Sequence, residues 1–284
     1  MQTEPPKRSS LQSNIEWQAW GHYDPLYGVS SIPGRNRRGK NPWTDEEFYA
    51  RGAEDWTLLS RHWEQYGIVK ESCLEIGCGA GRMTRVLSKT FGRVYGCDVS
   101  PGMISAAEPA LKDSPNVRFD LTDGRKIPLD DGSVTAAFST IVFQHLSDPL
   151  AVIDNFAEIY RCLSPGGTMM INLPLHDFPF TGFVPALRLL YRVGRFFDNF
   201  RANCKRLLLR LPIAYTRIGL KFGFHMHATS YDYPWLYSQL IGLGFDDIEV
   251  RSFWVESEQR LHYYVFGRKP TASAEPRSAR SVPV

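Results

Sequence analysis

The feature that most constrains the fold is a glycine-rich loop that directly follows an apolar run at residues 73–77. The run predicts a buried strand, and the alternating glycines Gly77, Gly79 and Gly81 lead from it into a helix-like stretch. Because glycine has no Cβ atom, the backbone can turn sharply there and bring its N–H groups close to a ligand. The loop predicts a nucleotide-like ligand at the carboxyl end of a parallel strand, with a purely structural strand-to-helix turn as the alternative.

The spacing of these glycines distinguishes between cofactors. A dinucleotide fingerprint, Gly-x-Gly-x-x-Gly, would place its third glycine at position 82, which holds Arg82. The observed pattern runs Glu-x-Gly-x-Gly-x-Gly from Glu75 to Gly81. It resembles motif I of class I S-adenosylmethionine-dependent methyltransferases, and a nicotinamide oxidoreductase is correspondingly disfavoured.

Length and composition are those of an ordinary soluble globular protein, with 284 residues, 43% hydrophobic and 22% charged. The net charge of +3 is too small to indicate a nucleic-acid partner. The five cysteines have no metal-type spacing, so we expect reduced thiols and no metal. Because neither a signal peptide nor a membrane-spanning stretch is recognisable, we expect a cytoplasmic location.

The order of predicted elements indicates an α/β fold with a doubly wound, mostly parallel sheet. A capping box from Thr44 to Glu47 predicts the start of a helix, and Gly67 predicts its end. Predicted strands lie at about 73–77, 93–98, 116–120, 134–140, 168–173, 247–254 and 261–267, with helices at about 81–90, 101–112, 149–162 and 232–243.

These elements predict five parts of the chain. Disordered tails are expected at 1–13 and 270–284, and an aromatic-rich N-terminal extension followed by a helix at 14–70. Residues 71–173 and 231–269 form the predicted S-adenosylmethionine-binding domain, and residues 174–230 a helical cap insert for the substrate. The aromatic extension is expected to wrap the domain, either packing on its surface or closing over the site.

A second polar signal comes at the end of the strand 93–98. Asp98 follows the glycine loop by about 20 residues, the distance at which strand-end acids accept hydrogen bonds from ribose hydroxyls. A helix cap is the structural alternative, although Ser100 before Pro101 is the better cap. Val99 and Met103 are candidates to sandwich an adenine ring.

Two further segments strengthen the family resemblance. Asp123-Gly124 ends a third strand, and residues 127–149 are similar to a segment of the same family, although Thr135 replaces the usual acid. The resemblance implies a seven-stranded sheet of order 3-2-1-4-5-7-6 with the last strand antiparallel. It also implies that Asp123 and Gly124 address the adenine. The expected cofactor-binding residues are Glu75, Gly77, Cys78, Gly79, Gly81, Asp98, Val99, Met103, Asp123, Gly124 and Thr140.

Methyl transfer from a sulfonium needs alignment and exclusion of water more than acid assistance, because the leaving group departs neutral. A base is needed only for a hydroxyl or a protonated amine. His145, just past the fourth strand, is the candidate base, and Gln144 is a candidate substrate contact. A histidine that only packs and hydrogen-bonds to its loop is the alternative for His145.

The insert is locally cationic, with nine Lys or Arg between residues 188 and 221 against one acid, Asp198. We favour a cap helix whose basic side chains face solvent. The alternative is that residues 183–211 contact an anionic or lipid-like acceptor or a membrane surface. The motif His225-x-His227 would bind a metal only with partners that the sequence does not identify.

The sequence thus predicts an S-adenosylmethionine-dependent methyltransferase that acts on a small-molecule or lipid-like acceptor, with oxygen favoured, and releases S-adenosylhomocysteine. An RNA or protein methyltransferase and a non-catalytic S-adenosylmethionine-binding protein remain as alternatives. No nucleic-acid partner is expected, and the sequence does not indicate the oligomeric state.

Overall fold

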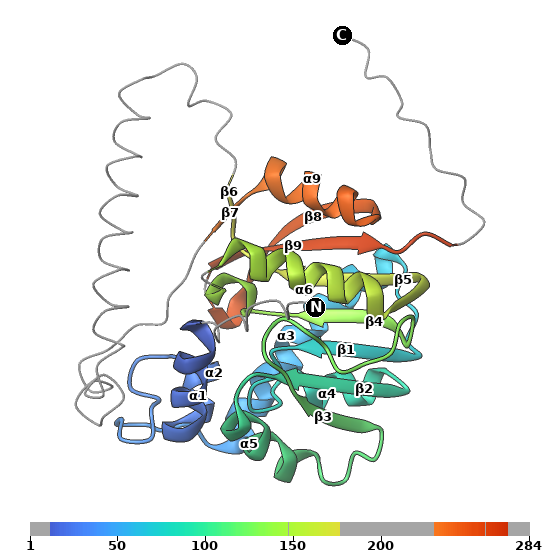
Figure 1. Ribbon diagram of the computed structural model, residues 1–284. Helices are drawn as coiled ribbons and strands as arrows, with labels where there is room; N and C mark the ends of the chain where they lie inside the picture. Colours follow the sequence, from blue (N-terminus) through green and yellow to red (C-terminus); the bar gives the residue numbers. More distant parts are fainter. Residues whose placement is uncertain (1–11, 147, 177–229, 259, 272–284) are drawn as a thin grey trace, which may run out of the picture.

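A central seven-stranded sheet organises the computed structural model, which describes residues 12–146, 148–176, 230–258 and 260–271 (Figure 1). The sheet has the order β3-β2-β1-β4-β5-β9-β8. Its strands are β1 (Ser72–Ile76), β2 (Arg93–Asp98), β3 (Val117–Leu121), β4 (Val134–Ser139), β5 (Leu163–Asn172), β8 (Asp246–Val255) and β9 (Arg260–Arg268). A short pair, β6 (Leu175–His176) and β7 (Tyr231–Asp232), lies beside it.

The pairing of the strands confirms the predicted topology. Strands β3, β2, β1, β4 and β5 pair in parallel, whereas β9 pairs antiparallel with both β5 and β8. The last strand in the chain therefore lies between two earlier ones, which is the predicted order 3-2-1-4-5-7-6 when the seven strands are counted along the chain.

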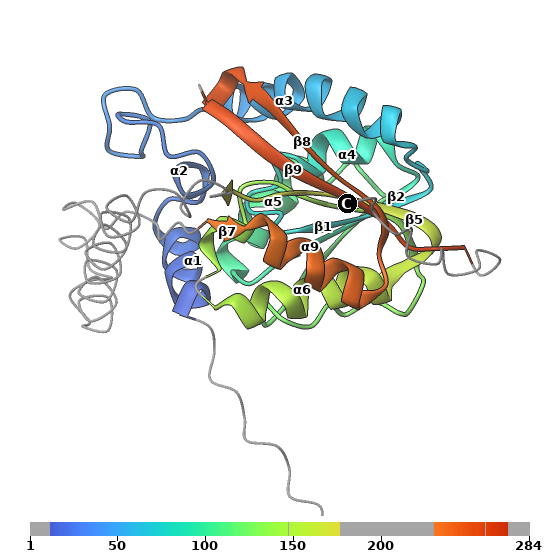
Figure 2. The same ribbon diagram turned by 90° about the horizontal axis from the view of Figure 1, so that it is seen from above.

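Helices cover both faces of the sheet (Figure 2). One face carries α3 (Asp45–Tyr66) and α4 (Thr84–Thr90), and the opposite face carries α6 (Pro149–Cys162) and α9 (Tyr233–Leu243). Further helical segments are α1 (Gln12–Tyr23), α2 (Pro25–Val29), α5 (Pro101–Leu111), η1 (Phe143–His145) and η3 (Glu256–Glu258).

Burial on both faces explains the continuous apolar runs of the parallel strands, because successive side chains point to opposite sides. Within β4, Ala137 packs in the core cluster that contains Phe156 of α6. Its neighbour Phe138 packs in the other cluster, with Trp56 and Trp63 of α3. The sequences of the central strands are therefore hydrophobic throughout and do not alternate between apolar and polar residues.

Several predicted helix boundaries are confirmed. Thr44 and Glu47 form the capping box of α3, and Gly67 ends that helix in the left-handed conformation with φ of 101°. Ser100 caps α5 through its side chain. Strand β5 begins at Leu163 and not near 168 as predicted, because Leu163 already pairs with Val134 before a register shift. The Pro165-Gly166-Gly167 sequence suggested a turn there.

The N-terminal segment folds into α1 and α2, which lie at the carboxyl ends of the parallel strands and contact α5 (Figure 1). Most of the predicted tails and of the cap insert, including residues 183–211, lies outside the described residues. In the part of the chain that the structure describes, no helix is both long and apolar enough to cross a bilayer.

Candidate functional site

A cavity of about 1360 Å³ opens at the carboxyl ends of β1, β2 and β4. Its floor contains Gly77 to Gly79 of the glycine loop, Cys97 to Val99, and the turn from Thr140 to Leu146. The predicted cofactor residue Gly81 is not among the residues that line it and packs against α5 instead. Its other walls come from α1, α2 and the loop to residue 39. In an open parallel sheet, this edge is where ligands bind.

The glycine loop adopts a backbone that other residues rarely adopt. Gly77, Gly79 and Gly81 have φ angles of 72°, 53° and 78°. A Cβ atom on Gly77 would lie 2.3 Å from the Cγ2 of Val142, and one on Gly79 would lie 2.5 Å from the Cγ2 of Val29. Glycine is therefore required by conformation and by the close approach of two other segments.

Asp98 lies at the end of β2 with only 8% of its surface exposed. Its carboxylate accepts a hydrogen bond of 2.8 Å from the N–H of Gly79 and one of 2.9 Å from the N–H of Ser100. Burial raises the pKa of Asp98 to about 6, and these backbone hydrogen bonds oppose the shift. Each carboxylate oxygen keeps a lone pair for a further donor from the cavity.

Glu75 is the buried acid of the motif, 3% exposed. The hydroxyl of Thr84 donates a hydrogen bond of 2.6 Å to its Oε2. Burial raises the pKa of Glu75 to about 8, opposed by the bond from Thr84 and the charge of Arg82. The side chain is therefore mostly protonated at neutral pH.

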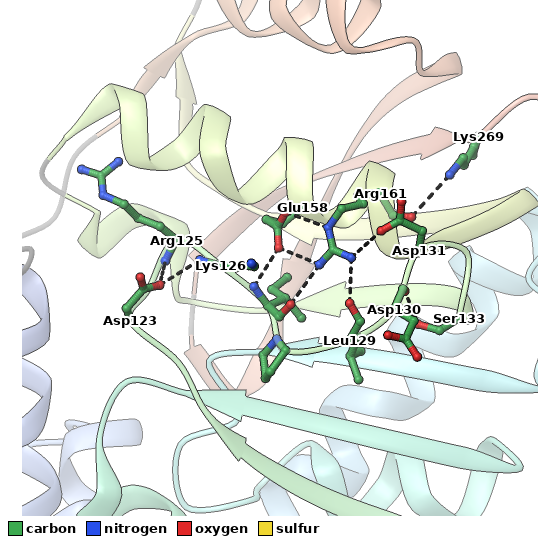
Figure 3. Close-up of polar contacts among 12 residues, drawn as sticks. Asp123, Arg125, Lys126, Leu129, Asp130, Asp131, Ser133, Glu158, Arg161 and Lys269 are labelled. Atoms are coloured by element: carbon green, nitrogen blue, oxygen red, sulfur yellow. Dashed lines mark hydrogen bonds and ion pairs between the residues drawn. The ribbon is translucent and has the colours of Figure 1, made fainter. Parts of the chain in front are cut away.

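Asp123 does not line the cavity, whereas its neighbour Gly124 does. The carboxylate of Asp123 instead accepts hydrogen bonds from the N–H groups of Arg125 (2.9 Å) and Lys126 (2.8 Å), as Figure 3 shows. The N–H of Gly124 donates to the hydroxyl of Thr122 at 3.3 Å. The acid thus stabilises its own turn, and Gly124 brings backbone to the cavity wall.

The two predicted adenine neighbours differ in position. Val99 lines the cavity, but Met103 is absent from the described residues that line it. Met103 is fully buried, and its Cε lies 3.0 Å from where a Cβ of Gly28 would stand. Met103 therefore packs beneath α2.

The turn after β4 brings Thr140, Gln144 and His145 to the cavity. Ile141 within it has a φ of 59°, and its N–H donates to the Oδ1 of Asn172 at 3.0 Å. Such a conformation is costly for a branched residue and requires support from its surroundings. Thr140 shares a hydrogen bond of 2.9 Å with the hydroxyl of Tyr264.

Gln144 and His145 are buried side by side, each 7% exposed. The Nε2 atoms of the two side chains lie 3.1 Å apart, which makes the imidazole nitrogen the acceptor when the Gln144 amide donates. The ring of Trp17 from α1 contacts His145 edge-on, with centroids 4.9 Å apart. The imidazole is therefore held between Gln144 and α1.

The aromatic extension was expected to pack on the domain or to close over the site, but the individual contacts of α1 were not predicted. Asn14 donates a hydrogen bond of 2.7 Å to the carbonyl of Asp123, and Gln18 donates one of 3.2 Å to the carbonyl of Val99. Gly21 packs closely on α5, because a Cβ atom there would lie 2.2 Å from the hydroxyl oxygen of Ser100. No local pattern in the sequence indicates these contacts, which join residues about 80 to 110 positions apart.

Residues 74–171 match the family described as "Methyltransferase domain". This part of the chain is therefore similar to methyltransferase domains. The glycine loop, Asp98, the turn at Gly124 and the turn after β4 all lie within the matched range.

Two curated relatives illustrate the similarity of this methyltransferase domain. A 37.1 kDa protein of Streptomyces fradiae, encoded in transposon Tn4556 and described as uncharacterized, is 37% identical over 110 residues, which are 38% of this chain and 31% of that protein. The malonyl-[acyl-carrier protein] O-methyltransferase of Serratia marcescens is 32% identical over 102 residues, 36% of this chain and 38% of that enzyme. The match thus spans 31% to 48% of the length of the first three such relatives.

Solved structures of methyltransferases share this fold. Phosphoethanolamine N-methyltransferase 1 of Haemonchus contortus, in complex with phosphoethanolamine and S-adenosylhomocysteine, has a TM-score of 0.55 at 17% identity, over 94% of this chain and 51% of that chain. The 1,6-didemethyltoxoflavin-N1-methyltransferase of Burkholderia thailandensis has a TM-score of 0.54 at 14% identity, over 94% and 93% of the two chains. Identities this low establish the fold alone.

Proposed function

We propose that this protein transfers the methyl group of S-adenosylmethionine to a hydroxyl oxygen of a small-molecule or lipid-like acceptor. The observation that carries the proposal is the pairing of Gly79 with Asp98 at the cavity floor, with the N–H of the glycine loop bonded to the carboxylate. This arrangement offers a close backbone approach and a strong acceptor at one place.

The cavity supports binding of two ligands together. Its volume of about 1360 Å³ exceeds the roughly 300–1,000 Å³ of a typical small-molecule site. A cofactor on the glycine loop would leave room beside Thr140, Gln144 and His145 for an acceptor. Trp17, which contacts His145, and Trp20 also line the cavity and would exclude water from the reacting atoms.

The chain's own groups fit the proposed cofactor. Asp98 would accept the ribose hydroxyls through its remaining lone pairs, and the glycine loop, with Glu75 and Cys78, would contact the methionine part. Val99 and Gly124 would flank the adenine. The fully buried Met103 and the Asp123 carboxylate, which is bonded to its own turn, would support these contacts from outside the cavity.

The bound cofactor would supply the methyl group from its sulfonium, and its sulfur would leave as a neutral thioether. The protein therefore has only to align the acceptor and to accept the proton that the acceptor loses. His145 lies in the cavity wall and would take that proton at Nε2, once the Gln144 amide turns away from this nitrogen. Gln144 would hold the ring or the acceptor through its amide. Trp17 would fix the orientation of the imidazole.

The matched relatives support the substrate class. One is an O-methyltransferase that acts on malonyl-[acyl-carrier protein], and another is a demethylmenaquinone methyltransferase of Tropheryma whipplei. A phosphoethanolamine N-methyltransferase also matches, which makes nitrogen the alternative acceptor atom.

Calorimetric titration with S-adenosylmethionine and S-adenosylhomocysteine tests the cofactor. Micromolar affinity in the wild-type protein, lost in Asp98→Ala, is the expected result. A folded wild-type protein that binds neither compound would refute the proposal. Release of S-adenosylhomocysteine from candidate acceptors then tests turnover, and binding with no turnover on any acceptor would point to a non-catalytic binding protein.

His145→Gln tests the proposed base once an acceptor is found. We expect kcat to fall by about 10²-fold to 10⁴-fold with unchanged affinity for S-adenosylhomocysteine. A variant that loses cofactor affinity in parallel with its thermal stability would instead indicate that His145 only packs in the loop.

A further inference from the structure

Four aromatic side chains of the N-terminal segment line the cavity, and we call Trp17, Trp20, Tyr23 and Tyr27 the aromatic wall. Trp17 and Trp20 are three residues apart on α1 and therefore lie on the same face of that helix. The rings of Trp20 and Tyr27 pack against each other, with centroids 5.8 Å apart, and so join α1 to α2. The aromatic-rich stretch of the sequence thus supplies one part of the cavity lining.

The rings of the aromatic wall are only half-buried, unlike the tryptophans of the core. Trp56 and Trp63 of α3 are buried against the sheet. The four rings of the aromatic wall instead keep part of their surface accessible. A single exposed aromatic ring is ordinary, but four that line one cavity present a large apolar surface to whatever binds there. This surface is available for burial by a ligand.

The aromatic wall has a fixed position relative to the rest of the cavity. Hydrogen bonds from Asn14 and Gln18 join α1 to the loops after β3 and β2. The same helix meets α5 so closely that a Cβ atom on Gly102 would lie 2.6 Å from the backbone of Gly21. The docking of α1 therefore determines where the aromatic rings lie.

Trp17 joins the aromatic wall to the turn that carries the proposed base. Its ring centroid lies 4.9 Å from that of His145, and the two rings are inclined at 67°. Thr140 and Gln144 of the same turn also line the cavity. A ligand ring that packs against Trp17 is therefore placed next to His145, and a hydroxyl group on that ring can approach the imidazole.

The side chains of the aromatic wall favour a planar aromatic acceptor over an acyl chain. Aromatic pairs attract each other by more than the burial of their apolar area, in edge-to-face or offset-stacked arrangements. A rigid ring also loses less conformational entropy on binding than a flexible chain does. Both effects act at the rings of Trp17 and Trp20 and would be absent at aliphatic side chains.

The basic residues of the cavity favour an anionic acceptor less strongly. Arg82 already forms an ion pair with Asp55, and Arg125 forms ion pairs with Asp148 and Asp154. The other Lys and Arg residues among the described residues that line the cavity are exposed, namely Arg37, Arg38, Lys126 and Arg260. Ion pairs of exposed side chains contribute little, because water screens them.

We propose that the aromatic wall is the acceptor site, and that the acceptor is a planar aromatic ring with a hydroxyl group. Trp17 and Trp20 would determine this specificity by packing against the ring, with its hydroxyl towards His145. The role as acceptor rests on the proposed function, whereas binding of an aromatic ring can be tested without it.

The first experiment titrates 2-naphthol and decahydro-2-naphthol into protein saturated with S-adenosylhomocysteine, by calorimetry. The two alcohols have the same carbon skeleton, but only 2-naphthol is flat and aromatic, so the burial of apolar area alone does not favour it. We expect 2-naphthol to bind on the order of tenfold more tightly. Equal affinities, tighter binding of the saturated alcohol, or no binding of either would refute the proposal.

The second experiment repeats the titrations in Trp17→Leu and Trp20→Leu. Leucine keeps an apolar side chain but removes the ring, so each variant should lose most of the preference for 2-naphthol. Trp20→Phe keeps a ring, should retain the preference, and guards against misfolding of the leucine variants, which thermal unfolding also checks. Trp254→Leu replaces an exposed tryptophan that is not among the residues lining the cavity, and it should change neither affinity. A preference that survives in both cavity variants would refute the aromatic wall as its cause.

The outcomes separate this inference from the proposed function. If the wild-type protein binds S-adenosylhomocysteine but shows no preference for 2-naphthol, the aromatic acceptor site is refuted while the proposed function stands. If the wild-type protein does not bind S-adenosylhomocysteine, the proposed function fails. The two alcohols titrated alone then decide the site: a preference for 2-naphthol that both leucine variants lose supports it, and any other result refutes it.

Discussion

The N–H of Gly79 donates a hydrogen bond of 2.8 Å to the carboxylate of Asp98, so the glycine loop after β1 and the end of β2 form one structural unit. The bond is buried. Protonation of the Asp98 carboxylate would weaken it as an acceptor, both for the N–H of Gly79 and for a ligand in the cavity. Several expectations depend on this unit and on the segments packed against it.

The affinity for S-adenosylhomocysteine should fall as the pH is lowered through the pKa of Asp98, which burial raises to about 6. The ionised carboxylate is the better acceptor for ribose hydroxyls, so affinity should decrease about tenfold by about pH 5. Calorimetry across this range measures the effect. In Asp98→Asn the affinity should be low throughout and the step should vanish, whereas Asp113→Asn, at an exposed acid, should keep it. A step that survives in Asp98→Asn would show that a group other than Asp98 causes it.

Glu75→Gln should stabilise the ligand-free protein at alkaline pH. Because burial raises the folded pKa of Glu75 to about 8 from an ordinary 4.5, the wild type loses stability as the pH rises between these two values. Glutamine keeps an oxygen to accept from Thr84 and does not ionise. The stability difference should be small near pH 5 and grow on the order of 1 kcal/mol for each further pH unit up to about 8. Urea unfolding of both proteins at several pH values checks this, and a constant difference would contradict it.

Gly21→Ala should release α1 from the sheet domain. The new Cβ would lie 2.2 Å from the hydroxyl oxygen of Ser100 and 2.9 Å from the backbone N of Met103, and backbone cannot yield as a flexible side chain does. We expect faster proteolysis within α1 and weaker binding of S-adenosylhomocysteine. Gly242→Ala in α9 is the matched control, because nothing lies within 4 Å of its new Cβ, and it should stabilise by about 0.5–1 kcal/mol. Equal protease resistance of the Gly21 variant and the wild type would show that α1 tolerates the methyl group.

Arg161→Ala should destabilise the protein by about 2 to 3 kcal/mol. Its guanidinium donates to the carbonyls of Leu129 (2.7 Å) and Ile127 (2.9 Å) and pairs with Glu158 at 2.8 Å, so it holds the turn before β4 against α6 (Figure 3). Arg118→Ala, which removes a 53% exposed side chain paired with one acid, should cost less than about 1 kcal/mol. Chemical denaturation compares the two, and similar losses would contradict the role of Arg161.

The part of the fold that local signals specify could be predicted from the sequence. The capping box of Thr44 and Glu47, the cap at Ser100 and the glycine end signal at Gly67 each act within a few residues. The sheet order followed from the family resemblance. Strand β5 was predicted too short, because its pairing with Val134 depends on a distant strand and local Pro and Gly suggested a turn.

The walls of the cavity could not be predicted in the same way. The contacts of Asn14 and Gln18 with the loops after β3 and β2 depend on where α1 docks, and its composition does not mark a buried face. The position of Met103 is a related case. Met103 was a candidate neighbour of the adenine, but Gly28 of α2 packs closely against it.

The position of β9 between β5 and β8 has a consequence for synthesis of the chain. Strand β8 emerges from the ribosome before β9, but among the strands that the structure describes it pairs only with β9. It therefore joins the sheet only after the last strand has been made. Arg51 donates to the carbonyl of Ser257, 206 residues later in the chain. The helix α3, which carries Arg51, is therefore translated early but gains this contact only late. The part of the cavity wall that contains Arg260 likewise forms only after nearly the whole chain has been translated.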